Sequence, residues 1–330
     1  MEFRNGISAA LEDGDKEIPT PPPADPPAPA ESPEKGPIRQ PVMELFDLDI
    51  DKASDESIQD VVRRQVEFEL DKSKLTDRYR ILLLHDEGPI GSTDSSRIYS
   101  ALGATDRTSP ILLILSSPGG DIPTAYFIGK LCREHTSSTF EVVVPRQAKS
   151  AATLICCAAD RIHMGSLSEL GPIDPQFGNV PALALKHSVE HIAQLVTEYP
   201  GSAEMFSKYL SRALKIESLG YYERVAASAM QYATRLLGSR RKPESTVGAN
   251  EQIARRLVYD YKDHGFVIDS REAADIFGDD VVVTNTEEYR VANALSVSLS
   301  FASWVCGFRL NRRLTYVGGT TGCWVFPKRQ

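Results

Sequence analysis

Short apolar runs alternate with amphipathic stretches between residues 80 and 165. The apolar runs predict strands over residues 81–84, 111–115, 140–144 and 161–164. The intervening stretches predict helices over residues 95–102, 122–133 and 149–158. Strands that alternate with helices in this way are typical of an α/β fold with a largely parallel sheet.

The chain on either side of this region has a different pattern. Residues 55–70 place Ile58, Val61, Val62 and Val66 at helical spacing, and residues 182–260 are mostly helical in pattern. These changes divide the chain into four parts: a disordered proline-rich acidic tail over 1–45, a helical lead-in over 46–77, the α/β domain over 78–285, and a C-terminal helix and tail of unknown role over 286–330.

Proline is concentrated in the first part of the chain. Ten of the 21 prolines fall in residues 19–41, where almost no apolar side chain is available for a core. Proline lacks a backbone N–H, so this stretch favours extended polyproline structure. It could be recognised by an SH3-like partner or serve only to solubilise the chain.

The acidity of the protein belongs to this leading segment. The formal net charge is −8, while residues 1–57 alone carry 14 acidic and 5 basic residues. The remaining chain is nearly neutral, which argues against a nucleic-acid binder. Five cysteines without CxxC spacing indicate reduced thiols, and no apolar run near the first residue resembles a signal peptide, so we expect a cytoplasmic protein.

One uncharged stretch, residues 291–308, has the minimum length for a membrane span. It contains Asn293 and four serines, which favour a helix packed against the protein. We therefore expect no membrane association.

Two motifs carry candidate chemistry. Pro118-Gly119-Gly120-Asp121 follows the strand at 111–115, and glycines there can expose backbone N–H groups to an oxyanion. Ser150 opens a helix of small residues directly after the strand at 140–144. Each motif alone has an ordinary structural interpretation, a tight turn or an N-terminal helix cap. Their order and their separation of about 30 residues make a catalytic site the better hypothesis.

The same motifs give the chain a family resemblance. LLILSSPGGD (112–121), VVVPRQAKSAATLICCAADRIHM (142–164) and LGPIDPQ (170–176) resemble the Clp protease/crotonase-like superfamily, and most closely its signal peptide peptidase A and serine dehydrogenase proteinase branch. The resemblance covers roughly residues 78–285. It implies stacked β-β-α units with a helical C-terminal elaboration, and a homo-oligomeric serine endopeptidase that hydrolyses peptides or unfolded protein segments.

The resemblance also implies roles for individual residues. Ser150 would be the nucleophile, and the N–H groups of Gly119 or Gly120 and of Ala151 would form the oxyanion hole. Ala152 departs from the glycine that the family usually has there. No metal or organic cofactor is implied.

The base that activates Ser150 is the open question. Asp174 occupies the region where Clp proteases have their histidine, so a Clp-type triad is not expected. The related single-domain peptidases place a lysine some 40 residues after the serine, and Lys186 lies 36 residues after Ser150 at a helix start. Apolar neighbours there could desolvate the amine and lower its pKa, so we predict a Ser150–Lys186 dyad.

Other bases stay possible. His264 and Lys149 are the alternatives, with Asp269 as a partner for His264. His163 is expected to be structural, and the His187–His191 pair lacks the third ligand that a metal site requires. Two other functions also stay open: a crotonase-type acyl-CoA enzyme, and an inactive scaffold recruited through its proline-rich tail.

Overall fold

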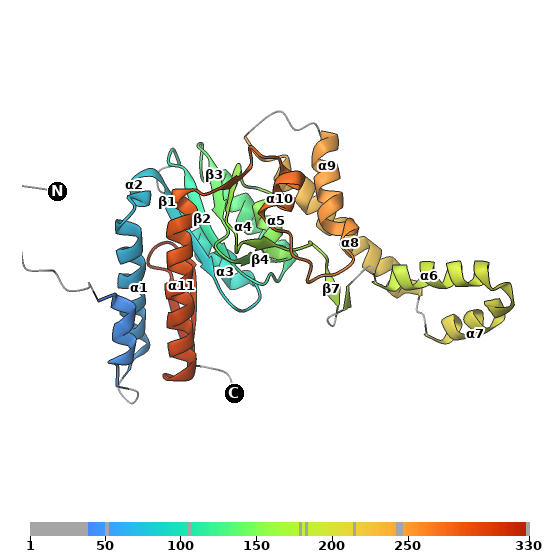
Figure 1. Cartoon of the computed structure of the whole chain (residues 1–330), viewed down its shortest axis with the longest axis horizontal. Helices are drawn as coiled ribbons and strands as arrows, with labels where there is room; N and C mark the ends of the chain where they lie inside the picture. The colour runs from blue at the N-terminus through green and yellow to red at the C-terminus, as the bar shows by residue number, and fades with distance from the viewer. Residues whose placement is uncertain are drawn as a thin grey trace, which may run out of the picture. The chain divides into compact units, whose positions relative to one another are not determined.

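The computed structural model describes residues 39–49, 53–103, 107–177, 180–181, 184–213, 216–241 and 247–327. Most of the predicted tail, residues 1–38, lies outside these ranges. Arg39–Gln330 forms one compact unit, and Figure 1 shows its helices and strands.

A seven-stranded sheet organises the unit, in the order β11-β10-β1-β2-β3-β5-β9. Its five parallel strands are β1 (Arg80–His85), β2 (Ile111–Ser116), β3 (Phe140–Val143), β5 (Arg161–Met164) and β9 (Val282–Thr284). The last two strands, β10 (Arg312–Gly318) and β11 (Cys323–Pro327), run antiparallel and extend the sheet beyond β1. The α/β prediction is confirmed, including all four predicted strands.

The parallel strands β1, β2, β3 and β5 are each followed by a segment in a second layer. After β3 comes β4 (Gln147–Ala148), which pairs in parallel with β6 (Glu169–Leu170) after β5. The loops after β1 and β2 contribute single bridges, Ile90 with Gly120 and Ser117 with Ala148. Helices α3 (Ser92–Leu102), α4 (Ile122–Glu134) and α5 (Ala151–Cys156) then return the chain. This is the stacked β-β-α arrangement that the resemblance implied.

The helical elaboration is an insertion between β6 and β9 rather than a C-terminal addition. After the short strands β7 (Gln176–Phe177) and β8 (Val180–Pro181) it contains α6 (Ala184–Glu198), η2 (Pro200–Ser202), α7 (Ala203–Ala213), α8 (Ile216–Leu237), α9 (Val247–Arg255), the π-helical turn η3 (Arg256–Asp260) and α10 (Ser270–Phe277). The alanines on one face of α8 are buried in the core, among them Ala226, Ala229 and Ala233.

Side chains alternate between the two faces of the sheet and build two cores. In β1, Leu82 and Leu84 belong to the core formed with α3, α4 and α5, whereas Ile81 and Leu83 belong to the core formed with α1 (Asp55–Asp71) and α11 (Glu287–Phe308). Burial on both faces explains why these strands are continuous apolar runs.

The two ends of the described chain meet on the second face. Helices α1 and α11 lie side by side there (Figure 1). The short η1 (Pro41–Phe46) buries Val42 and Leu45 in the same core. The tail predicted for residues 1–45 is therefore ordered from η1 onward, because these two apolar residues find a core to enter.

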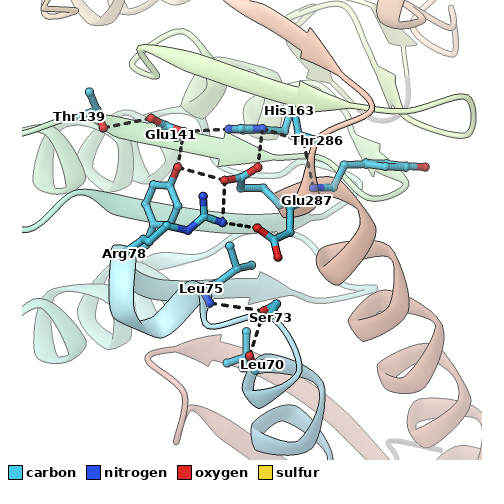
Figure 2. A network of polar contacts seen from close by, with 12 residues as sticks. Leu70, Ser73, Leu75, Arg78, Thr139, Glu141, His163, Thr286 and Glu287 are labelled. Atoms are coloured by element: carbon cyan, nitrogen blue, oxygen red, sulfur yellow. Dashed lines mark hydrogen bonds and ion pairs between the residues drawn. The ribbon is translucent and has the colours of Figure 1, made fainter.

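The C-terminal part, whose role was unknown, is integral to the fold. Figure 2 shows the polar network that joins the start of α11 to the sheet. His163 Nε2 lies 2.9 Å from Glu141 Oε2, and its Nδ1 lies 2.9 Å from Thr286 Oγ1. Arg78, which ends α2 (Leu75–Arg78), pairs with Glu287 at 2.7 Å. His163 thus has the structural role expected of it.

Among the described residues, α11 is the one helix long and apolar enough to cross a membrane. Here it packs one face into the second core, burying residues such as Leu295 and Leu299. The opposite face leaves Val297, Trp304 and Phe308 exposed.

Candidate active site

The glycine turn lies where β2 ends and α4 begins. Gly119 has φ +105° and Gly120 has φ +148°, conformations that side chains rarely adopt. The next residue, Asp121, caps α4 through a hydrogen bond from Thr124 N at 2.9 Å. The Gly119 N–H donates to Ser117 Oγ at 3.2 Å. The Gly120 N–H makes no hydrogen bond within the described part of the chain, so it is the available donor of the pair.

Ser150 occupies a strained turn between β4 and α5. Its φ is +51° and its ψ is −115°, a combination outside the regions allowed to residues with a side chain. The side chain makes no capping hydrogen bond to α5, so the ordinary role of a serine at this position is not used. A serine held on a strained strand-to-helix turn is the geometry of a nucleophile elbow.

The two turns face each other. A Cβ atom added to Gly119 would lie 3.0 Å from Ser150 Cβ and 3.3 Å from Ala151 N. Backbone hydrogen bonds hold this approach: Ser117 N donates to Gln147 O at 2.9 Å, and Lys149 N donates to Ser117 O at 3.1 Å. The Ala151 N–H, at the first position of α5, also has no partner in the described ranges.

Lys149, one of the alternative bases, is held by polar contacts with β6 and the loop before α10. Its Nζ lies 3.0 Å from Glu169 Oε2 and donates to the carbonyl oxygens of Leu170 and Phe266 at 3.4 and 3.3 Å. Its stem packs against Gly171, where an added Cβ would lie 2.6 Å from Lys149 Cδ. These contacts direct the Lys149 amine toward Glu169 and two backbone carbonyls.

Lys186 lies at the start of α6, as expected from the sequence. Its side chain is 42% exposed and its Nζ lies 3.4 Å from Glu223 Oε1. The apolar surroundings predicted for the amine are therefore not present in this conformation, because α6 turns Lys186 toward Glu223 on α8. No hydrogen bond joins Lys186 to Ser150 among the residues that the structure describes.

His264 has a partner that the sequence did not indicate. Its Nδ1 lies 3.8 Å from Asp174 Oδ2, and both Nδ1 and Asp174 Oδ1 are buried without a hydrogen bond. Burial raises the pKa of Asp174, while His264, Gln176 and His187 oppose that shift. The expected partner, Asp269, instead caps α10. The pairing joins loops about 90 residues apart in the sequence, so no local pattern indicated it.

No cluster of three His, Cys, Asp or Glu side chains suited to a metal occurs among the described residues. His191 is exposed on α6, as is His187 beside it.

The comparison with protein families matches the part of the chain that contains the glycine turn and Ser150. Residues 89–196 match the family model of ClpP-like SDH-type serine proteinases. This segment is ClpP-like. It contains the glycine turn, Ser150 and Lys186, whereas His264 lies beyond it.

Two curated relatives come from Methanocaldococcus jannaschii. The uncharacterized protein MJ0137 is 42% identical over 97 residues, which cover 29% of this chain and 34% of that protein. The uncharacterized protein MJ1495 is 38% identical over 92 residues, covering 28% of this chain and 31% of that protein. The chain thus spans about a third of the length of the curated relatives it matches.

Solved structures of ClpP proteases are more distant. ClpP1 from Listeria monocytogenes is 15% identical with a TM-score of 0.39, covering 66% of this chain and 98% of its own. The ClpP catalytic domain from Plasmodium falciparum is 14% identical with a TM-score of 0.37, covering 66% and 91%. The fold described above is established by the sheet topology itself.

Proposed function

We propose that this protein is a serine peptidase that hydrolyses peptide bonds with Ser150 as the nucleophile. One observation carries the proposal. Ser150 is held at φ +51°, makes no capping bond and faces the Gly119–Gly120 turn, beside two N–H groups without partners. Backbone strain persists where the surrounding structure enforces it, and such sites are commonly functional.

In the proposed reaction, Ser150 Oγ attacks the carbonyl carbon of the scissile peptide bond as a base removes its proton. The N–H groups of Gly120 and Ala151 donate to the oxyanion that forms. The C–N bond then breaks, the leaving amine takes the proton from the base, and an acyl ester remains on Ser150. Water attacks this ester and releases the second product.

Lys186 is the base in this proposal. It lies within the ClpP-like segment, and its observed partner Glu223 is itself about half exposed. An exposed ion pair is worth only about 0–1 kcal/mol, so substrate binding could displace it. His264 is the second candidate, because its Nδ1 lies 3.8 Å from Asp174 Oδ2 and is buried without a hydrogen bond among the described residues.

The test measures cleavage of a mixed peptide library by mass spectrometry, together with acylation of the protein by a fluorophosphonate probe. Ser150→Ala should lose cleavage by at least about a thousandfold. Lys186→Ala should lose cleavage to the same extent. Lys208→Ala is the matched control, since Lys208 is also a helical lysine in an exposed ion pair, and it should keep cleavage. If Lys186→Ala keeps its activity and His264→Gln abolishes cleavage, the base is His264. The control is His191→Gln, which changes an exposed histidine and should leave cleavage intact.

The other functions give different outcomes. Saturable binding of an acyl-CoA thioester that persists in Ser150→Ala, without peptide cleavage, would replace the proposal by a crotonase-type enzyme. If the probe does not acylate the protein and no peptide is cleaved, while a partner protein binds through residues 19–41, the protein is a scaffold. The homo-oligomer, the SH3-like partner and the cytoplasmic location stay predictions.

A further inference from the structure

A cavity lies at the carboxyl edge of β1, β2 and β3, and its volume is about 260 Å³. Its lining includes His85 at the end of β1, Ser116 at the end of β2, Arg146 after β3, and Ser296 and Ser300 on α11. Carboxyl ends of parallel strands are common places for ligands in α/β proteins.

The cavity is on the opposite face of the sheet from α5. Along β2, Leu113 and Leu115 face the core that contains α5, while Leu112 and Ile114 face the core that contains α11. By the same alternation Ser116 faces α11. The cavity thus opens toward α11, and Gln147 on β4, three residues before Ser150, also lines it.

His85 lines the cavity with its imidazole. The residue is 6% exposed, and its imidazole makes no hydrogen bond to any described residue. Burial lowers the pKa of His85 to about 4, although Asp86 acts in the opposite direction. The ring is consequently neutral at pH 7 and offers one N–H donor and one bare nitrogen. The ring nitrogens are not among the fully buried polar atoms of the described residues that lack a partner, so they are open to the cavity, where a ligand can reach them.

Arg146 brings a positive charge to the same cavity. One of its terminal nitrogens donates to Asn293 Oδ1 at 2.7 Å, and no carboxylate of the described residues forms an ion pair with it. Two acids of the lining already have cations: Glu169 pairs with Lys149 at 3.0 Å and Asp86 with Arg313 at 2.7 Å.

The third acid, Glu87, is exposed, so solvent screens its charge. Arg146 thus brings to the cavity a positive charge with which no carboxylate of the described residues pairs.

We propose that this cavity binds a carboxylate group, which accepts hydrogen bonds from Arg146 and from the His85 imidazole. The free guanidinium nitrogens suit the two oxygens of a carboxylate, and the hydroxyls of Ser116, Ser296 and Ser300 supply further donors. The carboxylate belongs either to the C-terminus of a peptide or to a small free acid, since the cavity is too small for a folded partner. This site is independent of the peptidase proposal.

The test follows the ring signals of His85 by NMR in the full chain with isotope-labelled histidine, assigned with His85→Gln. The probes are N-acetylglycine, its amide N-acetylglycinamide, and succinate. N-acetylglycine should shift the His85 signal saturably and raise the pKa of the ring, because an anion favours its protonated form. N-acetylglycinamide has the same shape without the charge and should cause no saturable shift.

Arg146→Gln should weaken N-acetylglycine binding by about tenfold or more. The control is Arg271→Gln, which removes the same charge at an exposed position away from the cavity. Saturation by both acids would assign a general carboxylate site, and saturation by N-acetylglycine alone would assign a peptide C-terminus. Equal shifts with acid and amide, no saturable shift with either acid, or unchanged binding in Arg146→Gln would overturn the proposal.

Discussion

Ser150→Gly and Ser150→Ala should both inactivate the protein, but the glycine variant should have the larger free energy of unfolding. Both substitutions remove the hydroxyl, so they differ only in the Cβ atom. At φ +51° and ψ −115°, alanine keeps the backbone strain that serine has, and glycine releases it. The comparison therefore isolates the strain from the loss of the nucleophile.

The magnitude follows from three contributions. Backbone strain of this kind costs about 1–3 kcal/mol, and a ψ far from the left-handed helical region places Ser150 toward the upper value. Glycine loses about 0.5–1 kcal/mol through its greater freedom in the unfolded chain. Removing one buried methyl group costs about 0.8 kcal/mol. The glycine variant should be more stable than the alanine variant by about 1 kcal/mol, which corresponds to roughly 2–4 °C in Tm.

Urea unfolding followed by circular dichroism measures this difference directly, with thermal melting as a second measurement. Wild-type protein should be close to the alanine variant, since both carry the strain. A glycine variant that is equally or less stable than the alanine variant would show that the Ser150 backbone stores no strain. The elbow interpretation would then lose its physical basis.

Three further predictions concern other parts of the molecule. Gly119→Ala should lower peptide turnover about a hundredfold or more without unfolding the chain, because the added Cβ would overlap a carbonyl oxygen at 2.7 Å beside the nucleophile; unchanged turnover would separate this turn from catalysis. The pKa of His85 is about 4 in the folded chain against 6.5 as its ordinary value, so the unfolded chain binds more protons between these values. The stability contributed by the neutral ring is full above pH 6.5 and is lost as the pH falls toward 4, by about 3 kcal/mol. Urea unfolding at pH 7, 5 and 4 should show this loss in wild type and in exposed His191→Gln, but less of it in His85→Gln; identical slopes in all three would contradict it. Leu299→Ala should cost about 2–5 kcal/mol in urea unfolding because Leu299 is buried between α11 and the sheet, whereas Phe308→Ala, 80% exposed, should change stability by less than about 1 kcal/mol; equal costs would mean that α11 packs differently.

The parallel part of the sheet could be predicted because its strands are buried on both faces. Each then reads as an uninterrupted apolar run, bounded by turn residues. The strands β10 and β11 were missed for the opposite reason. Their sequence mixes Arg312, Arg313, Thr315 and Trp324 with apolar residues. β10 pairs with β1, which lies more than 200 residues earlier, and among the described strands β11 pairs only with β10. No local pattern carries that information.

The candidate site divides in the same way. Gly119, Gly120 and Ser150 were predicted because positive φ and helix starts leave a trace in residue type. The backbone strain at Ser150 could not be predicted, because serine is an unusual residue for that conformation. The approach of His264 to Asp174 was missed because it depends on how two distant loops fold together. The exposure of Lys186 depends on Glu223, which α8 brings beside α6.

The position of β10 has a consequence for how the chain is made. β1 pairs with β10 along one edge, and β10 begins about 230 residues after β1 in the sequence. At synthesis rates of about 5–20 residues per second, β10 is synthesised roughly 10–50 s after β1. During that time Leu82, Leu83 and Leu84 present an open, uncharged strand edge. A chain truncated before residue 312 would lack β10 and would leave that edge of β1 open permanently. Such a chain would be prone to pair with strands of other molecules, and chaperones or proteases would have to remove it.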